Sequence, residues 1–388
     1  MRILMMTNTY TPLVGGLERS VKSFAEAYRR RGHRVIVVAP SFQGMPRWER
    51  DVIRVPALQH FSGTDFSVRL PIPGLLARAL RHFQPEIVHA HHPFLLGDTA
   101  LRIAMAHQAP LVFTHHILFE QYTHYLPIAA PPAERFLTAL ATTYANLCDR
   151  VFSPSHSVAQ LLRTHGVHTP IDVVPTGVSL ARFRHGRAQA CRAAAGIPAD
   201  AFVVGHLGRL APEKNLGVVL AAYEAVKAQQ PRARLVFVGD GPMRAELAAR
   251  APEAVFAGQR SGDDLAAHYA GLDLFLFPSL TETFGNVTTE AMASGCAVVA
   301  FDSAAAGELI RSGVNGWLAG AGRESDFVAA ARVAALDAPA RALVSEAARA
   351  TARRLDWGDI TARFEGVLET AIARAESTSL MPGLQPAA

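Results

Sequence analysis

The chain has 388 residues, half of them hydrophobic, so we expect a folded protein of two domains, because one hydrophobic core rarely grows that large. Its net charge of +5 comes without a nucleic-acid recognition motif, and no apolar run approaches the roughly 18 residues of a membrane span. Three cysteines without metal-ligand spacing fit a reducing cytoplasm: Cys148, Cys191 and Cys296.

Apolar, strand-like segments alternate with amphipathic, helix-like segments in the first half of the chain. The apolar start is too short for a signal peptide and is typical of a first strand. The predicted strands are residues 3–6, 35–39, 87–90, 111–114, 151–153 and 172–175. The predicted helices are residues 17–31, 75–83, 98–107, 133–148 and 157–165. This alternation favours a parallel α/β sheet.

An Arg/Ala-rich stretch up to Pro198 predicts a hinge, after which the alternation starts again. Strands are predicted at 202–207, 234–238, 255–257, 272–277, 297–300 and 316–318, with helices at 216–228, 243–250, 263–270, 287–294 and 305–310. The expected fold class is α/β, with two Rossmann-like domains that face a central cleft. We place them at 1–180 and 181–355, followed by a helix at 356–376 that packs back toward the first domain and a disordered tail at 377–388.

Two glutamates eight residues apart follow the predicted strand 272–277. Glu282 lies in a loop, and Glu290 lies in the early turns of the next helix. Backbone N–H groups at a helix N-terminus suit phosphate, and carboxylates suit the hydroxyls of a sugar or ribose. A nucleotide sugar needs both kinds of contact. Taken alone, the spacing also fits a loop glutamate and a solvated helix glutamate without a shared role.

The loop after the predicted strand 202–207 carries two cations next to a glycine. Gly208 lets the backbone approach a ligand, and Arg209 and Lys214 lie at the carboxyl end of the strand, where open α/β sheets bind ligands. Arginine grips phosphate with a planar fork and lysine acts as a point charge. The chain has only three lysines, so Lys214 is harder to dismiss as an incidental surface charge. Gly239 ends the strand 234–238 in a tight turn that fits a base or ribose contact.

The sequence contains no Asp-x-Asp triplet and no His/Cys/Asp cluster with metal-ligand spacing. A transfer from a nucleotide sugar would therefore use cations and helix N–H groups to hold the leaving-group charge. We predict no metal site and no cofactor.

With these residues in place, nearly the whole chain resembles a GT-B retaining glycosyltransferase of family four, the glycosyl transferase group 1 type. The resemblance rests on Glu-x7-Glu, Gly-Arg-Leu-x-x-Glu-Lys and Val-Gly-Asp-Gly-Pro. It implies that Arg209 and Lys214 bind the donor diphosphate. It also implies that Glu290 holds the donor ribose and that Glu282 contacts the donor sugar.

Further donor contacts follow from the same resemblance. The backbone near sugar and phosphate is implied to be that of Phe284, Gly285, Asn286 and Val287. Gly16 resembles the glycine that faces the reaction centre. His116 resembles the histidine that touches the sugar near the scissile bond, although His115 is adjacent and can be confused with it.

The family's mechanism is a front-face displacement with retention, usually without a metal, in which the leaving diphosphate helps to deprotonate the acceptor. The chain departs from many relatives at 303–308, where Ser-Ala-Ala-Ala-Gly-Glu replaces a Gly-Gly-x-x-Glu turn. This departure leaves the fine shape of the donor pocket open.

The acceptor side is similar to the subgroup that glucosylates diacylglycerol, on the segments 89–97 and 114–127. This similarity implies an acceptor site beside Glu120, Tyr122 and Tyr125. Residues 67–83 form a basic amphipathic segment, and residues 1–180 carry 17 basic and 11 acidic side chains, against 21 and 22 in the remainder. Such a half can sit on an anionic leaflet, although the segment also fits an ordinary helix.

The leading expectation is a cytoplasmic enzyme, peripheral on the inner face of the membrane, that moves a hexose from a UDP-glucose-like donor to a lipid. A mannosyl or hexosyl transferase with a polysaccharide or soluble acceptor is the alternative, ahead of a GT-B sugar-nucleotide epimerase or a non-enzymatic scaffold. Nucleic acid is not an expected partner.

Overall fold

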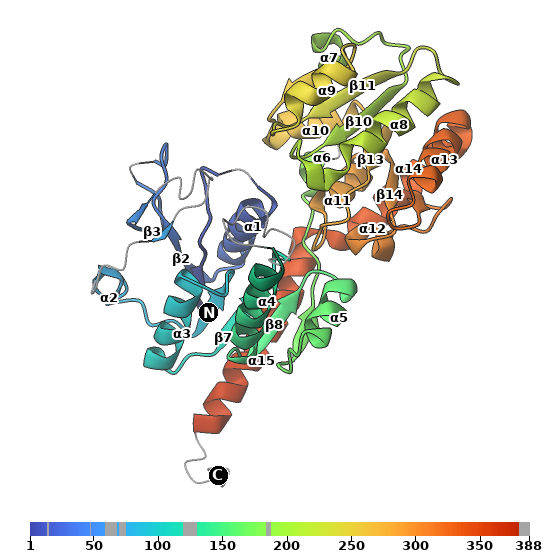
Figure 1. Ribbon diagram of the computed structural model, residues 1–388. Helices are drawn as coiled ribbons and strands as arrows, with labels where there is room; N and C mark the ends of the chain where they lie inside the picture. Colours follow the sequence, from blue (N-terminus) through green and yellow to red (C-terminus); the bar gives the residue numbers. More distant parts are fainter. Residues whose placement is uncertain are drawn as a thin grey trace. The chain divides into compact units, whose positions relative to one another are not determined.

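The computed structural model describes residues 1–13, 15–46, 48–58, 68–69, 75–118, 130–183 and 188–379 (Figure 1). The chain divides into two compact units. Unit 1 comprises Met1–Pro175 and Gly358–Ala388, and unit 2 comprises Thr176–Trp357. The first unit is therefore built from both ends of the chain, and the second from one continuous segment.

The main sheet in the described part of unit 1 has seven parallel strands in the order β3-β2-β1-β6-β7-β8-β9. They are β1 (Arg2–Met6), β2 (Arg34–Pro40), β3 (Val52–Val55), β6 (Ile87–Ala90), β7 (Leu111–Thr114), β8 (Arg150–Ser153) and β9 (Ile171–Val173). A short antiparallel pair, β4 (Ala57–Leu58) and β5 (Val68–Arg69), accompanies it. Central strands such as β6 and β7 are buried along their whole length, which is why they are apolar runs without alternation.

The helices of unit 1 that the structure describes include α1 (Gly16–Arg30), α2 (Leu75–Ala79), α3 (Leu96–His107), α4 (Ala130–Asn146) and α5 (His156–Thr164). Helix α1 is amphipathic and buries one face through Val21, Phe24 and Tyr28. The core of the unit joins strand residues such as Leu4, Val88 and Phe113 to helix residues such as Leu96 and Ala100.

Helix α15 (Trp357–Ser379) completes unit 1 from the C-terminal end of the chain (red in Figure 1). The ring of Phe364 lies 4.5 Å from that of Phe24 and 4.4 Å from that of Phe152. Beside it, the buried carboxylate of Glu365 accepts from Arg31 Nε at 2.6 Å and contacts His33 Nε2 at 2.8 Å.

The prediction of a disordered tail from residue 377 is wrong for its first three residues. Helix α15 continues to Ser379, and Ser377 Oγ donates to the carbonyl of Ala373, one turn earlier in the helix, at 2.9 Å. The rest of the predicted tail, residues 380–388, lies outside the described residues.

The sheet of unit 2 has six parallel strands in the order β12-β11-β10-β13-β14-β15. They are β10 (Val203–Leu207), β11 (Arg234–Val238), β12 (Val255–Gly258), β13 (Leu274–Phe277), β14 (Ala297–Phe301) and β15 (Trp317–Ala319). In both units the order reverses beside the first strand, which is the doubly wound arrangement with its ligand crevice at the reversal point. The predicted pair of Rossmann-like domains is confirmed.

The described helices of unit 2 are α6 (Leu180–Phe183), α7 (Ala188–Ala194), α8 (Leu216–Lys227), α9 (Arg244–Arg250), α10 (Gly262–Ala270), α11 (Asn286–Ser294), α12 (Ala304–Leu309), α13 (Glu324–Leu336) and α14 (Ala338–Ala352), with the short 3₁₀ turns Pro212–Lys214 and Arg353–Leu355. Among the described residues, no helix combines the length and the apolar character that a membrane span requires.

The predicted hinge before Pro198 is wrong, because its described residues are packed parts of unit 2. Phe183 is buried against the ring of Tyr269, with centroids 5.8 Å apart. Arg192 donates to the carbonyl of Gly271 at 2.9 Å and pairs with Asp273 at 2.9 Å. The composition rich in Arg and Ala suggested a linker, but Phe183 and Arg192 attach this stretch to the rest of unit 2.

We predict that Phe364→Ala destabilises unit 1 by about 3–5 kcal/mol, because it removes a fully buried ring from an aromatic cluster. Phe136→Ala, a change at a ring that is 66% exposed in the same unit, serves as the matched control and should cost less than about 0.5 kcal/mol. Calorimetric unfolding of the two variants checks this. Equal shifts of the two variants would show that α15 contributes little to the unit.

Candidate functional site

The loop after β10 is fastened to the loop after β11 by backbone contacts. Gly208 N donates to the carbonyl of Val238 at 2.9 Å, and Leu210 N donates to that of Asp240 at 2.9 Å. Gly239 has a φ of +136°, and a Cβ there would lie 1.9 Å from the carbonyl oxygen of Gly208. Position 239 therefore requires glycine, because the two backbones touch.

Lys214 closes the turn that this loop leads into. The turn Pro212–Lys214 begins at a proline, whose fixed φ suits a first helical position. It ends at Asn215, whose φ of +52° is left-handed. The Asn215 amide donates to the carbonyl of Pro278 at 2.9 Å. The loop after β10 is thus joined to the loop after β13.

Lys214 and Glu282, two of the predicted site residues, come from these two loops and meet in the structure. The ammonium of Lys214 donates to Oε1 of Glu282, and Ser279 Oγ donates to the same oxygen at 2.8 Å. The side chains of Lys214 and Glu282 are 14% and 20% exposed, so the pair is partly shielded from water. Arg209 lies in the same loop as Lys214 and is exposed.

Glu290 lies in the second turn of α11 and has a partner of its own. Its Oε2 accepts from the hydroxyl of Tyr269 at 3.0 Å, and the Tyr269 ring is fully buried. The helix begins after Gly285, whose φ of +87° is left-handed. Glu282 and Glu290 are therefore held by different contacts.

The remaining predicted residues at this helix start differ in exposure. Phe284 and Gly285 are buried, whereas Asn286 and Val287 are partly exposed at the first turn. The first-turn N–H groups of a nine-residue helix carry the positive end of its dipole. This end of α11 is suited to an anion.

The segment 303–308, which departs from the family pattern, contains a non-glycine residue with a left-handed backbone conformation. Ala304 has a φ of +48°, a left-handed conformation that favours glycine, and many relatives carry a glycine pair there. The next residue, Ala305, donates its N–H to the carbonyl of Phe284 at 2.9 Å. The strained position is therefore coupled directly to the start of α11.

His206 is a buried residue of this region that the sequence analysis did not assign. Its Nδ1 donates to the carbonyl of Leu276 at 3.0 Å, which fixes the tautomer, and the rings of Phe275 and Phe277 stack beside it. Burial lowers the pKa of His206 to about 4, so this imidazole is neutral next to Lys214 and Glu282. Ser279 and Tyr269 were missed as well, although Ser279 stands only three residues before Glu282.

In unit 1, His116 belongs to a cluster of neutral histidines. His91 Nδ1 lies 2.9 Å from His116 Nε2, and the ring of His91 lies tilted against that of His89 with centroids 4.2 Å apart. His89 Nε2 lies 2.7 Å from Thr114 Oγ1. Burial lowers the pKa of each of these imidazoles. His115, the neighbour that could be confused with His116, is buried as well.

Gly16 is the first residue of α1, at the end of the loop that follows β1. A Cβ at Gly16 would meet nothing within 4 Å, so the described neighbours leave open space there. The predicted acceptor residues Glu120, Tyr122 and Tyr125 lie outside the described residues, and so do residues 67 and 70–74 of the amphipathic segment 67–83.

Comparison with known proteins identifies the family. Residues 14–182 match Glycosyltransferase Family 4, and residues 201–337 match Glycosyl transferases group 1. A GDP-mannose-dependent alpha-mannosyltransferase of Corynebacterium glutamicum is 31% identical over 82% of this chain and 76% of that protein. The chain belongs to glycosyltransferase family 4. It is an enzyme that transfers a glycosyl group.

Two further comparisons bear on this glycosyltransferase. An alpha-monoglucosyldiacylglycerol synthase of Streptococcus pneumoniae is 28% identical over 77% of this chain and 71% of that protein. The crystal structure of Anabaena Alr3699/HepE in complex with UDP superimposes with a TM-score of 0.76 at 22% identity, covering 95% of this chain and 100% of the other. That likeness shows the GT-B fold.

The neutral histidines predict a steep loss of stability of the glycosyltransferase in acid. Burial lowers the pKa of His89 and His92 to about 3 and that of His115 to about 4. Because an unfolded histidine binds its proton near pH 6.5, the stabilisation is fully present above that value. It is lost as the pH falls toward the folded pKa, at up to about 1.4 kcal/mol per pH unit for each histidine.

In the described part of unit 2, only His206 has a pKa lowered in this way. We therefore predict that lowering the pH from 7.5 to 5 moves the calorimetric transition of unit 1 further than that of unit 2. Phe364→Ala identifies which transition belongs to unit 1. Equal movement of both transitions would contradict the assignment of neutral, buried imidazoles.

Proposed function

We propose that this glycosyltransferase moves a hexose from a UDP-glucose-like donor to the hydroxyl of a lipid such as diacylglycerol, with retention of configuration and without a metal ion or other cofactor. The observation that carries the donor half is the meeting of Lys214, Glu282 and Ser279 at the reversal point of the unit 2 sheet. The lipid half is supported by the named activity of the Streptococcus pneumoniae relative.

The donor would be held by three kinds of group. Arg209 and Lys214 would bind the diphosphate, together with the N–H groups at the start of α11. Glu290, oriented by the hydroxyl of Tyr269, would accept from the ribose hydroxyls. Close backbone at Gly208 and Gly239 would let the nucleotide lie against the strand ends.

Donor binding would exchange partners within the Lys214–Glu282 pair. A diphosphate competes with Glu282 for the same ammonium, because phosphate and carboxylate are both acceptors for Lys214. Glu282 would keep the Ser279 hydroxyl and turn to a hydroxyl of the donor sugar. In the free enzyme, the Lys214 ammonium and the Glu282 carboxylate thus pair with each other, and the donor would separate them.

In the transfer step, the bond from the sugar anomeric carbon to the diphosphate oxygen breaks, and its electron pair stays on the diphosphate. The acceptor oxygen forms the new bond on the same face, and its proton passes to the leaving diphosphate. Arg209 and Lys214 stabilise the charge that develops there. Neutral His116, held by His91, contacts the sugar without adding a charge.

The second candidate is mannosyl transfer from GDP-mannose, to a lipid, soluble or polysaccharide acceptor. It is favoured by the name of the Corynebacterium glutamicum relative, which is 31% identical against 28% for the diacylglycerol synthase. Turnover measured with each donor decides between the two candidates.

We predict that Lys214→Ala lowers the turnover of the donor by about 10²–10³-fold, the usual effect of removing a group that stabilises transition-state charge. Lys227→Ala is the matched control, because Lys227 lies in the same unit and pairs with Glu253 at 2.7 Å on the surface. Both variants are compared with the wild type by the initial rates at which they consume UDP-glucose and GDP-mannose. Normal turnover in Lys214→Ala would remove the diphosphate role of Lys214.

We also predict glucosyl transfer to dioleoylglycerol in phosphatidylglycerol vesicles, with EDTA present and with an α-linked product from the α-linked donor. Mass spectrometry and NMR of the extracted lipid give the product and its anomeric configuration. Vesicles without dioleoylglycerol are the control. Activity that needs Mn²⁺ would refute the metal-free route, transfer only to a soluble sugar would refute the lipid acceptor, and preference for GDP-mannose would select the second candidate.

A further inference from the structure

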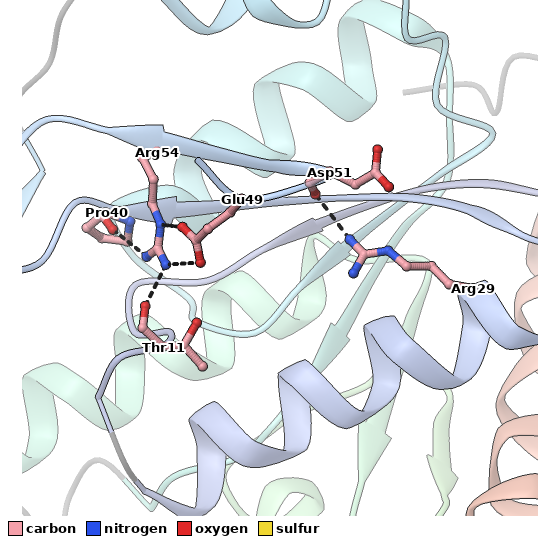
Figure 2. Close-up of polar contacts among 6 residues, drawn as sticks. All are labelled: Thr11, Arg29, Pro40, Glu49, Asp51 and Arg54. Carbon is pink, nitrogen blue, oxygen red and sulfur yellow. Dashed lines mark hydrogen bonds and ion pairs between the residues drawn. The ribbon is translucent and has the colours of Figure 1, made fainter. Parts of the chain in front are cut away.

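Arg54 is a nearly buried cation in β3 of unit 1 that the proposed chemistry does not use. Its side chain is only 11% exposed. A charge taken out of water is costly unless it is paired and its hydrogen-bonding groups are satisfied. Figure 2 shows how the surrounding groups from three segments converge on this guanidinium.

The first partner of Arg54 is Glu49, which binds it as a two-pronged fork. Arg54 Nε donates to Oε2 of Glu49 at 2.6 Å, and Nη2 donates to Oε1 at 2.8 Å. The Glu49 side chain is 14% exposed. A bidentate pair of this kind fixes the plane of the guanidinium and leaves the other N–H groups pointing in set directions.

Those other N–H groups reach two backbone carbonyls. Nη1 donates to the carbonyl of Pro40, at the end of β2, at 2.9 Å. Nη2 donates to the carbonyl of Thr11, in the loop between β1 and α1, at 2.5 Å. Figure 2 draws both contacts. Arg54 therefore ties the loop after the first strand to the second and third strands.

Two buried aromatic rings complete the setting. The guanidinium carbon of Arg54 lies 5.4 Å from the ring centroid of Tyr10 and 5.8 Å from that of Phe42, within cation–π range. Tyr10 precedes Thr11 in the same loop, so the loop is held by a ring contact as well as by a hydrogen bond.

The start of the loop is fastened elsewhere. Asn8 Nδ2 donates to the carbonyl of Phe94 at 2.9 Å, and Asn8 Oδ1 accepts from Leu96 N at 3.0 Å. The loop then runs to Gly15, the N-cap of α1, which has no side-chain cap hydrogen bond. Between Asn8 and the helix, Arg54 holds the loop backbone from another element, at the carbonyl of Thr11.

We propose that Arg54 is a positioning residue that sets the path of the loop into Gly15 and Gly16, and with it the first-turn N–H groups of α1. The proposal rests on the proposed function and on the expectation, drawn from the family resemblance, that Gly16 faces the reaction centre. It deepens that function by naming a residue that acts through backbone placement without touching substrate. Because the fork satisfies three acceptors at once, lysine does not replace it.

The chain offers a matched control on the same two strands. Arg29 Nη2 donates to the carbonyl of Val35, at the opposite end of β2, and to that of Asp51, just before β3, each at 3.1 Å. Figure 2 draws the contact with Asp51. The hydrogen bonds of Arg29 go to the sheet, and its charge also acts on Tyr10, an interaction that a lysine at this position would keep. Arg29→Lys therefore loses a guanidinium that braces the sheet, whereas Arg54→Lys loses one that braces the loop.

The first measurement is hydrogen exchange of the full-length variants, read on peptides covering residues 9–19. We expect Arg54→Lys to speed exchange there by about tenfold, because the loop opens without its tether, while the peptides of β6 and β7 keep their protection. Arg29→Lys should leave residues 9–19 unchanged. Wild-type exchange in Arg54→Lys, or equal acceleration in both variants, overturns the proposal.

The second measurement is turnover of UDP-glucose and GDP-mannose together with the Kd for UDP and GDP. In Arg54→Lys we expect turnover to fall by about tenfold or more, since small displacements near a reacting group are costly, while the nucleotide Kd changes by less than about twofold. Loss of nucleotide binding in parallel with turnover would contradict a role confined to unit 1.

A third variant covers the case in which Arg54→Lys does not fold. Glu49→Gln keeps the guanidinium and both carbonyl contacts but weakens the fork, so exchange at 9–19 should rise by a smaller factor than in Arg54→Lys. Wild-type exchange in this variant counts against the fork. A wild-type enzyme that turns over neither donor would refute the proposed function, and the exchange experiment would still decide the role of Arg54.

Discussion

The carbonyl of Gly208 and the α-carbon of Gly239 approach so closely that a single added carbon would overlap them. This contact sets how far apart the loops after β10 and β11 can be. Lys214 follows within the same loop, and Asn215 then reaches the carbonyl of Pro278. The place where Lys214 meets Glu282 is therefore determined by backbone contacts more than by the conformation of the long lysine side chain. The backbone of such a site needs little reorganisation when a charged ligand arrives, and only the side-chain pair changes partners.

The two units differ in the charge of the polar side chains beside the reversal points of their sheets. Unit 2 keeps charged groups at its sheet reversal, with Lys214 against Glu282 and with Glu290 beside Tyr269. Unit 1 fills the corresponding edge of its sheet with imidazoles that burial keeps neutral. Neutral rings can hold hydroxyl groups without attracting an anion. This division fits the proposed reaction, in which the charged groups of unit 2 would bind a diphosphate and the neutral groups of unit 1 would bind sugar and acceptor hydroxyls.

The sequence predicted every strand of the second sheet and all strands of the first main sheet except β3, and it assigned Lys214 and Glu282 to one candidate site. Buried parallel strands are continuous apolar runs, so β6, β7 and β13 were evident, and the reversal point of such a sheet brings Lys214 and Glu282 together. Helices α13 and α14 were missed because most of their buried positions are alanine, which marks no apolar face. The contacts of Tyr269 and Arg54 join residues far apart in the chain and depend on side-chain direction, which no local pattern encodes.

Helix α15 returns the end of the chain to the unit in which the chain began. During synthesis, Phe24 and Phe152 leave the ribosome long before Phe364, the ring that packs between them in the finished unit. Unit 2 is one continuous segment and is complete before that helix emerges. We therefore expect the second unit to mature first, while the first waits with an uncovered aromatic surface until the last residues are made. The order of domains along the gene would then be the reverse of their order of folding.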